Sequence, residues 1–164
     1  MSWDATIFGT LTMPAGEFGD WLGRTVDSAN VPDAGKFLST SEVNGKTVEE
    51  RLLELESFKD EEGVGFIEIK RDATVGRIEV RSFLSKDEYL DHGVILAAVW
   101  AAAEKGASGE LYFAGMLTAS FCYKLTVGPK GVTLKALKDG AADKLPTYQE
   151  IEDDVEARIA ELDL

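Results

Sequence analysis

Alternating apolar and polar residues at the start of the chain predict a β-strand that is buried on one face. The apolar positions follow the period of two of a pleated strand; they are Trp3, Ala5, Ile7, Gly9, Leu11 and Met13. Phe8 is the exception, because it falls among the polar positions. Pro14 ends the strand, and apolar residues at helical spacing then predict a helix over residues 15–26.

Residues 27–46, which follow the first helix, are typical of a loop. Two later segments have the pattern of acidic amphipathic helices. Thr47 and Glu50 form a capping-box pattern that starts a helix at 47–59. Its apolar stripe consists of Val48, Leu52 and Leu55. Residues 147–164 form the last predicted helix, with acidic residues on the opposite face. Its apolar stripe consists of Ile151, Val155, Ile159 and Leu162.

Residues 64–84 are typical of a β-hairpin whose register follows from charge. With a four-residue turn at 73–76, opposite charges face one another across the strands, which is mildly favourable. The expected pairs are Asp72 with Arg77, Lys70 with Glu79 and Glu68 with Arg81.

Residues 85–105 give the clearest helical pattern. Ser85 and Glu88 form a second capping box, and residues 94–103 include no polar side chain. A helix lying on one face of a sheet keeps a polar stripe, so this helix needs protein on most of its sides. It is either a central helix flanked by other elements or part of a contact between subunits.

Three more strands are predicted, at 110–117, 121–127 and 132–138, and the last two form a hairpin. If Val127 faces Val132, then Lys124 faces Lys135, which is slightly unfavourable. The segment 121–138 holds four lysines and no acidic residue. There are three explanations for these lysines. An acidic helix covers this face, the lysines protect an exposed strand pair from edge-to-edge pairing, or the face is a site for an anion or partner. We favour the first two together.

The element order β-α-α-β-β-α-β-β-β-α predicts one α+β domain spanning residues 1–164. We expect a mainly antiparallel sheet of five to six strands with about four helices packed on it. The helix at 85–105 is the one place for a parallel crossover.

Charge narrows the choice of partners. The 164-residue chain has a formal net charge of −13. Residues 42–62 hold eight acidic and three basic residues, and residues 147–164 hold seven acidic and one basic residue. Such a surface repels nucleic acids and anionic membranes and attracts basic proteins. We expect a cytoplasmic protein, because the chain has one cysteine, its first residues do not resemble a signal peptide, and its longest apolar run is too short to span a membrane.

No motif for catalysis or metal binding stands out. His92 lies one helical turn after Glu88, but zinc requires three or four ligands, so we expect a partly exposed histidine. Cys122 lies inside a predicted strand and is interpreted as a small apolar residue. We therefore expect no catalytic residue, no metal and no cofactor.

The leading hypothesis is a non-catalytic acidic binding protein, such as a bacterial immunity protein that inhibits a basic toxin or enzyme by stoichiometric binding. The expected partner-binding residues are Glu49, Glu50, Glu54, Glu56, Glu152, Asp153, Asp154 and Glu156. One alternative is a structural protein that forms homo-oligomers through the apolar helix. Another is an enzyme or small-ligand domain with an aromatic pocket, for which the candidates are Trp3, Trp21, Trp100, Tyr112 and Tyr123.

Overall fold

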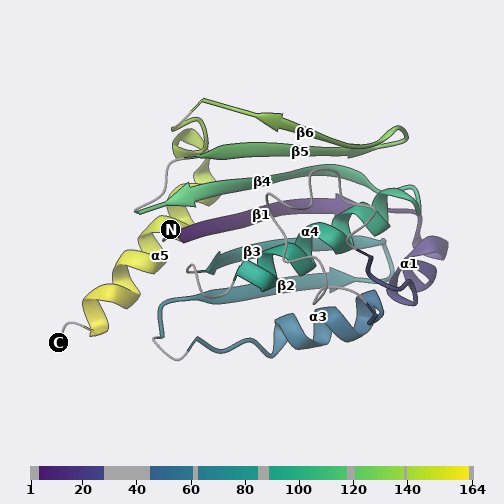
Figure 1. Cartoon of the computed structure of the whole chain (residues 1–164), viewed down its shortest axis with the longest axis horizontal. Helices are drawn as coiled ribbons and strands as arrows, with labels where there is room; N and C mark the ends of the chain where they lie inside the picture. Colours follow the sequence, from purple (N-terminus) through teal and green to yellow (C-terminus); the bar gives the residue numbers. More distant parts are fainter. Residues whose placement is uncertain are drawn as a thin grey trace.

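The chain folds into a six-stranded sheet with helices on both faces (Figure 1). The computed structural model describes residues 4–27, 45–60, 63–84, 89–117, 121–138 and 140–162, with the backbone alone at 89–91. The elements are β1 Asp4–Thr12, α1 Ala15–Leu22, α3 Val48–Glu56, β2 Phe66–Asp72, β3 Arg77–Leu84, α4 Tyr89–Ala103, β4 Ser108–Met116, β5 Cys122–Gly128, β6 Gly131–Ala136, the 3₁₀ helix η3 Ala142–Lys144 and α5 Pro146–Leu162.

The strand order in the sheet is β2-β3-β1-β4-β5-β6, and every neighbouring pair is antiparallel. Because β3 and β4 both pair with β1, these two strands run parallel to each other, and α4 connects them across β1. This is the predicted crossover. The predicted α+β class and element order are confirmed.

Both predicted hairpin registers are also confirmed. In the β2–β3 hairpin the facing pairs are Asp72 with Arg77, Lys70 with Glu79 and Glu68 with Arg81. In the β5–β6 hairpin Val127 faces Val132, and Lys124 faces Lys135. Charge pairing and a tight turn were sufficient to fix these registers because both are local properties.

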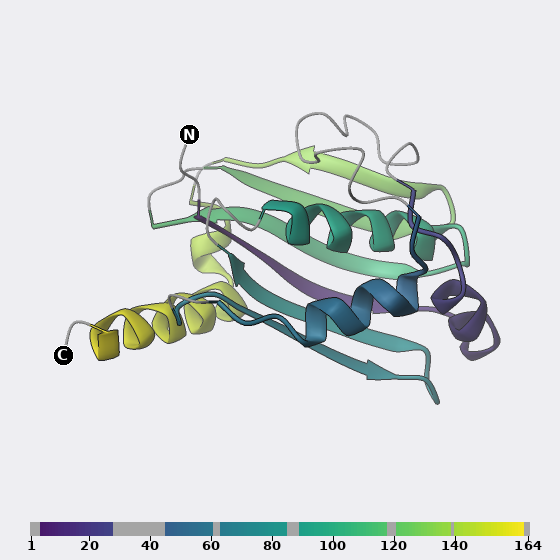
Figure 2. The same ribbon diagram turned by 60° about the horizontal axis from the view of Figure 1, so that its bottom comes forward.

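The larger core lies on the sheet face that α1, α3 and α4 cover (Figure 2). Residues 94–102 of α4 are each at most 9% exposed. The Trp21 indole on α1 donates a hydrogen bond to the Ala98 carbonyl at 3.0 Å, which joins the two helices. Of the two explanations for the apolar helix, the central position is therefore correct: α4 is enclosed within its own chain.

The opposite face has a second, smaller core beneath α5, and this core corrects the prediction for β1. Phe8 is 4% exposed and packs there with Phe83, Tyr148 and Ile151. The strand is thus buried on both faces rather than one, because a helix from the far end of the sequence covers its second face. Phe8, the exception to the alternating pattern, is the residue of β1 that packs beneath α5.

The structure differs from the sequence prediction at the end of α1 and at the end of the apolar stripe of α5. The first helix stops at Leu22, before Gly23, since Gly19 and Gly23 weaken helical propensity. The predicted stripe of α5 is buried at Ile151 and Val155, but Leu162 is 57% exposed, because the last turn extends beyond the sheet (Figure 1). The capping pair predicted at residues 85 and 88 lies outside the described residues.

Two glycines allow β1 and β4 to lie close together. Gly9 and Gly109 have φ angles of 153° and 146°. A Cβ atom on Gly9 would lie 2.2 Å from the Glu110 carbonyl oxygen, and one on Gly109 would lie 2.2 Å from that of Thr10. Both positions therefore require glycine.

Candidate functional site

Two acidic residues of α3 form ion pairs within the molecule. The Arg71 guanidinium on β2 lies 2.5 Å from a Glu49 carboxylate oxygen and 2.9 Å from one of Glu56. Burial lowers the pKa of Arg71, but the hydrogen bonds that its guanidinium donates to Glu49 and Glu56 outweigh that effect and raise the pKa overall. Glu49 and Glu56 thus attach α3 to the edge of the sheet.

The other two α3 candidates also have partners inside the chain. Glu54 pairs with Lys46 and, at 3.1 Å, with Arg51; the hydrogen bond from Lys46 is the main reason that the pKa of Glu54 is lowered. Glu50 forms the predicted capping box with Thr47. All four carboxylates predicted to bind a partner from α3 therefore have a role in the fold.

The acidic residues of α5 are arranged differently. Among the described residues, Asp154 is the one acidic residue of α5 that forms an ion pair, with Arg81 of β3 at 2.6 Å. The one basic residue of the helix, Arg158, lies over the Phe66 ring at 4.6 Å from its centroid. The acidic residues of α5 that form no ion pair with any other described residue are Glu150, Glu152, Asp153, Glu156 and Glu161.

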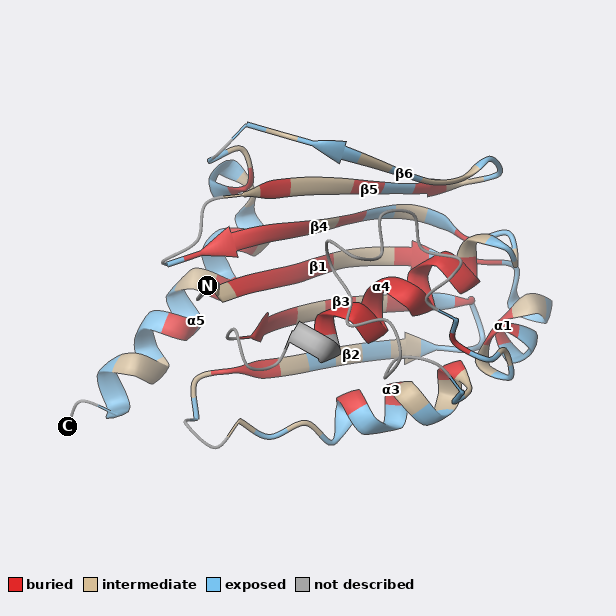
Figure 3. Ribbon diagram, in the orientation of Figure 1, coloured by how far each residue is buried: buried red, intermediate tan, exposed pale blue. Residues whose placement is uncertain are grey.

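These five residues define the free acidic face of α5. The outer side of the helix is largely exposed (Figure 3). Glu150 and Glu161 were missing from the sequence-based set, although the positions of Ile151 and Val155 place both away from the apolar stripe. The face is thus wider than the four clustered acidic residues indicated.

The carboxylate of Glu152 is repelled by neighbouring carboxylates. Partial burial raises the pKa of its carboxyl, and the nearby charges of Glu156, Asp143 and Asp153 raise it further. Like charges that are not neutralised within the molecule favour the binding of a cation or a basic group.

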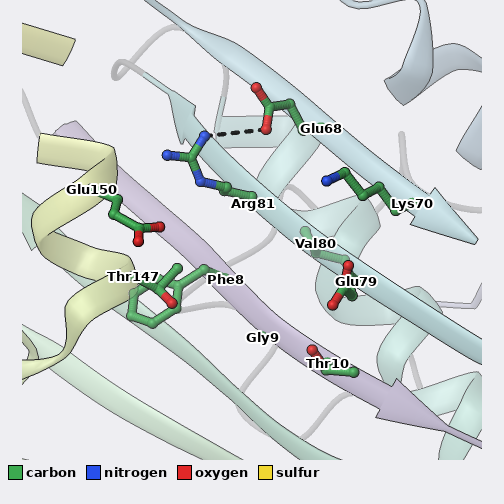
Figure 4. Close-up of a pocket in the computed structure, with 10 residues that line it drawn as sticks. All are labelled: Phe8, Gly9, Thr10, Glu68, Lys70, Glu79, Val80, Arg81, Thr147 and Glu150. Carbon is green, nitrogen blue, oxygen red and sulfur yellow. Dashed lines mark hydrogen bonds and ion pairs between the residues drawn. The ribbon is translucent and has the colours of Figure 1, made fainter. Parts of the chain in front are cut away.

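A recess of about 220 Å³ adjoins the first turns of α5 (Figure 4). Its floor is the open part of the sheet, and its wall carries Thr147 and Glu150. Arg81 points into the recess but is already paired with Glu68 at 3.1 Å and with Asp154. The recess therefore continues from Glu150 of α5 onto a part of the sheet where Glu68 and Glu79 are paired with arginines. The lining residues are Phe8, Gly9, Thr10, Glu68, Lys70, Glu79, Val80, Arg81, Thr147 and Glu150.

The aromatic residues considered for a ligand pocket do not meet in one place. Trp21 and Trp100 belong to the main core, and Tyr123 packs against it. Tyr112 lines a shallow recess of about 360 Å³ beside α5, stacked on Phe8 with a centroid separation of 5.3 Å. Trp3 lies outside the described residues.

The expectation of a partly exposed His92 is wrong. Its side chain is fully buried and lies 5.3 Å from the Phe113 ring, centroid to centroid. Burial lowers the pKa of the imidazole to about 3, although a hydrogen bond with the Ala5 backbone acts in the opposite direction. Glu88, the residue considered with it, lies outside the described residues.

Within the described ranges, no three His, Cys, Asp or Glu side chains lie close enough to hold a metal ion. Cys122 is buried in the smaller core, as its sequence context indicated. None of the helices in the described part of the chain has both the length and the apolar character needed to span a bilayer.

The lysine-rich hairpin forms one edge of the sheet. Lys124 pairs with Glu110 of β4 at 3.1 Å and lies 6.0 Å from the centroid of the Tyr112 ring. The expectation of a covering acidic helix is wrong for Lys124, because its carboxylate partner, Glu110, lies on the neighbouring strand. The expectation of an exposed strand pair agrees with the edge position of β6.

Comparison of the chain with protein-family models, with curated proteins and with solved structures finds no match.

Proposed function

We propose that this chain is a non-catalytic binding protein that recognises a basic protein through the free acidic face of α5 and the recess beside it. The observation that carries the proposal is the contrast between the two acidic helices. The carboxylates of α3 are paired or cap the helix within the fold, whereas five carboxylates of α5 have no ion-pair partner among the described residues. A basic partner would relieve the repulsion that raises the pKa of Glu152.

The form of this function that best fits the charge is stoichiometric inhibition of a basic toxin or enzyme in the bacterial cytoplasm. A net charge of −13 steers a cationic partner toward the protein. Exposed charges raise the association rate more than they add to the equilibrium affinity. The rate at low salt is thus the property expected to depend on α5.

The first experiment captures the partner. The protein is immobilised, native lysate of the source organism is passed over it at low salt, and retained proteins are identified. We expect one basic protein in stoichiometric amount, released as salt rises. If that protein is an enzyme, one equivalent of this chain should abolish its activity.

Two variants of equal charge then test the surface. Asp153→Lys with Glu156→Lys reverses two charges on α5, and Glu17→Lys with Asp20→Lys reverses two on α1. Each pair of reversals changes the net charge from −13 to −9. We expect the α5 variant to lower the association rate by about tenfold at low salt and the α1 variant to change it little.

Equal effects of the two variants would mean that overall acidity, and not α5, drives binding. Retention of no basic protein at all would refute the proposed function itself.

A further inference from the structure

The outer edge of β6 is an open sheet edge within the described part of the chain. β6 is the last strand in the sheet order and pairs only with β5. The opposite edge strand, β2, has α3 alongside it, attached through Arg71 (Figure 1). An open edge presents backbone donors and acceptors that an added strand can use.

The hydrogen-bond pattern identifies which backbone groups point outward. The Leu137 amide donates to the Cys122 carbonyl at 2.8 Å. In an antiparallel pair, residues alternate between bonding inward and pointing away, so Thr133 and Lys135 bond to β5. The N–H and C=O groups of Val132, Leu134 and Ala136 therefore point toward the open edge.

The side chains at this edge specify the chemistry of an added strand. Lys130, Lys135 and Lys138 are exposed and form no ion pair with a described residue, in contrast to Lys124. Of these three, Lys135 alone lies within β6, and Lys130 and Lys138 lie just beyond its two ends. On the face of β6 opposite Lys135, Val132 and Leu134 pack against the main core yet are only partly buried. An added strand would therefore meet positive charge on one face and apolar surface on the other.

We propose that β6 accepts an acidic extended segment of another protein as a seventh strand of the sheet. Its acidic side chains would lie beside Lys135, and its alternate, β-branched side chains would cover the exposed margin of Val132 and Leu134. A second copy of β6 does not fit, because it would bring like charges together. The lysines thus exclude self-pairing and select an acidic strand.

The test uses a fluorescein-labelled peptide of about eight residues that alternates valine and glutamate, near the usual strand length. Fluorescence anisotropy is measured at about 0.15 M salt, where a Debye length of about 8 Å limits repulsion from distant acidic residues. We expect binding of this peptide. A valine–lysine peptide should bind at least about tenfold more weakly.

Matched controls separate strand addition from charge attraction. N-methylation of alternate peptide amides removes backbone donors and is expected to abolish binding. Lys135→Glu should weaken binding several-fold, whereas Lys59→Glu, an exposed lysine between α3 and β2, should not.

Three results would overturn this inference: no binding of the acidic peptide, equal binding of its N-methylated form, or equal binding of the lysine peptide. These results do not depend on α5. The Asp153→Lys with Glu156→Lys variant is expected to bind the peptide as the unmodified chain does.

Discussion

At the scale of single residues, His92 shows how burial controls chemistry. The imidazole is completely enclosed near Phe113 and the Ala5 backbone. A buried imidazole loses the hydration that stabilises its charged form. His92 is therefore neutral at physiological pH, which makes it a core residue that gives stability a pH dependence.

Replacing His92 with leucine is expected to reduce the loss of stability in mild acid. The pKa is 6.5 for the free side chain and about 3 in the fold, so below pH 6.5 the unfolded chain binds a proton that the folded chain does not. Stability from this group is present above pH 6.5 and is lost as pH falls toward 3. Between pH 6.5 and 4.5 the loss is at most about 2.7 kcal/mol.

Urea denaturation of both proteins at several pH values between 7 and 4.5 measures this effect. The carboxylates titrate in both proteins, so they cancel in the comparison. Parallel stability curves for the two proteins would show that His92 has no part in the pH dependence.

At the scale of elements, the two acidic helices have similar composition but different roles. α3 lies beside β2, and Arg71 joins the two elements through Glu49 and Glu56. α5 packs on the opposite sheet face through Tyr148, Ile151 and Val155. Its outer acidic residues are thus available to a partner.

The Arg71 attachment predicts measurable coupling between α3 and β2. A double-mutant cycle with Arg71→Met and Glu49→Gln is expected to give a coupling free energy of about 0.5–1 kcal/mol, since the Arg71 side chain is 22% exposed. The same cycle at Arg77 and Glu79, whose side chains are 50% and 39% exposed, serves as the control and should give less. Equal coupling at the two sites would contradict the proposed attachment.

At the scale of the whole molecule, opposite charges occupy different elements. The free acidic face belongs to α5, and exposed lysines flank the β6 edge of the sheet. Among the described residues, the one long apolar helix is α4, and its residues 94–102 are enclosed within the chain (Figure 3). The two proposed partners, a basic protein and an acidic strand, would therefore bind at separate places, and the described residues 94–102 of α4 offer no apolar surface to a second copy.

We expect the isolated protein to be monomeric. Light scattering at micromolar concentration should give a mass near 17.8 kDa, because α4 is enclosed and a net charge of −13 makes copies repel each other. A repeat at high salt, where the repulsion is screened, should give the same mass. A mass of two or more chains would support the homo-oligomer alternative.

Local patterns were sufficient for most of the fold and only part of the site. The capping box of Thr47 and Glu50 and the facing pairs of both hairpins follow from side chains close in sequence. Which acidic residues of α3 and α5 form ion pairs could not be predicted from the sequence, because their partners Arg71 and Arg81 lie on other elements.

The α+β class, the element order and the hairpin registers could be predicted from the sequence, because periodicity, turns and neighbouring charges act over short separations. The packing of α5 on Phe8, the burial of His92 and the pairing of the acidic residues of α3 are seen only in the folded chain. These features arise from contacts between residues far apart in the chain. Composition and spacing do not specify which distant surfaces meet.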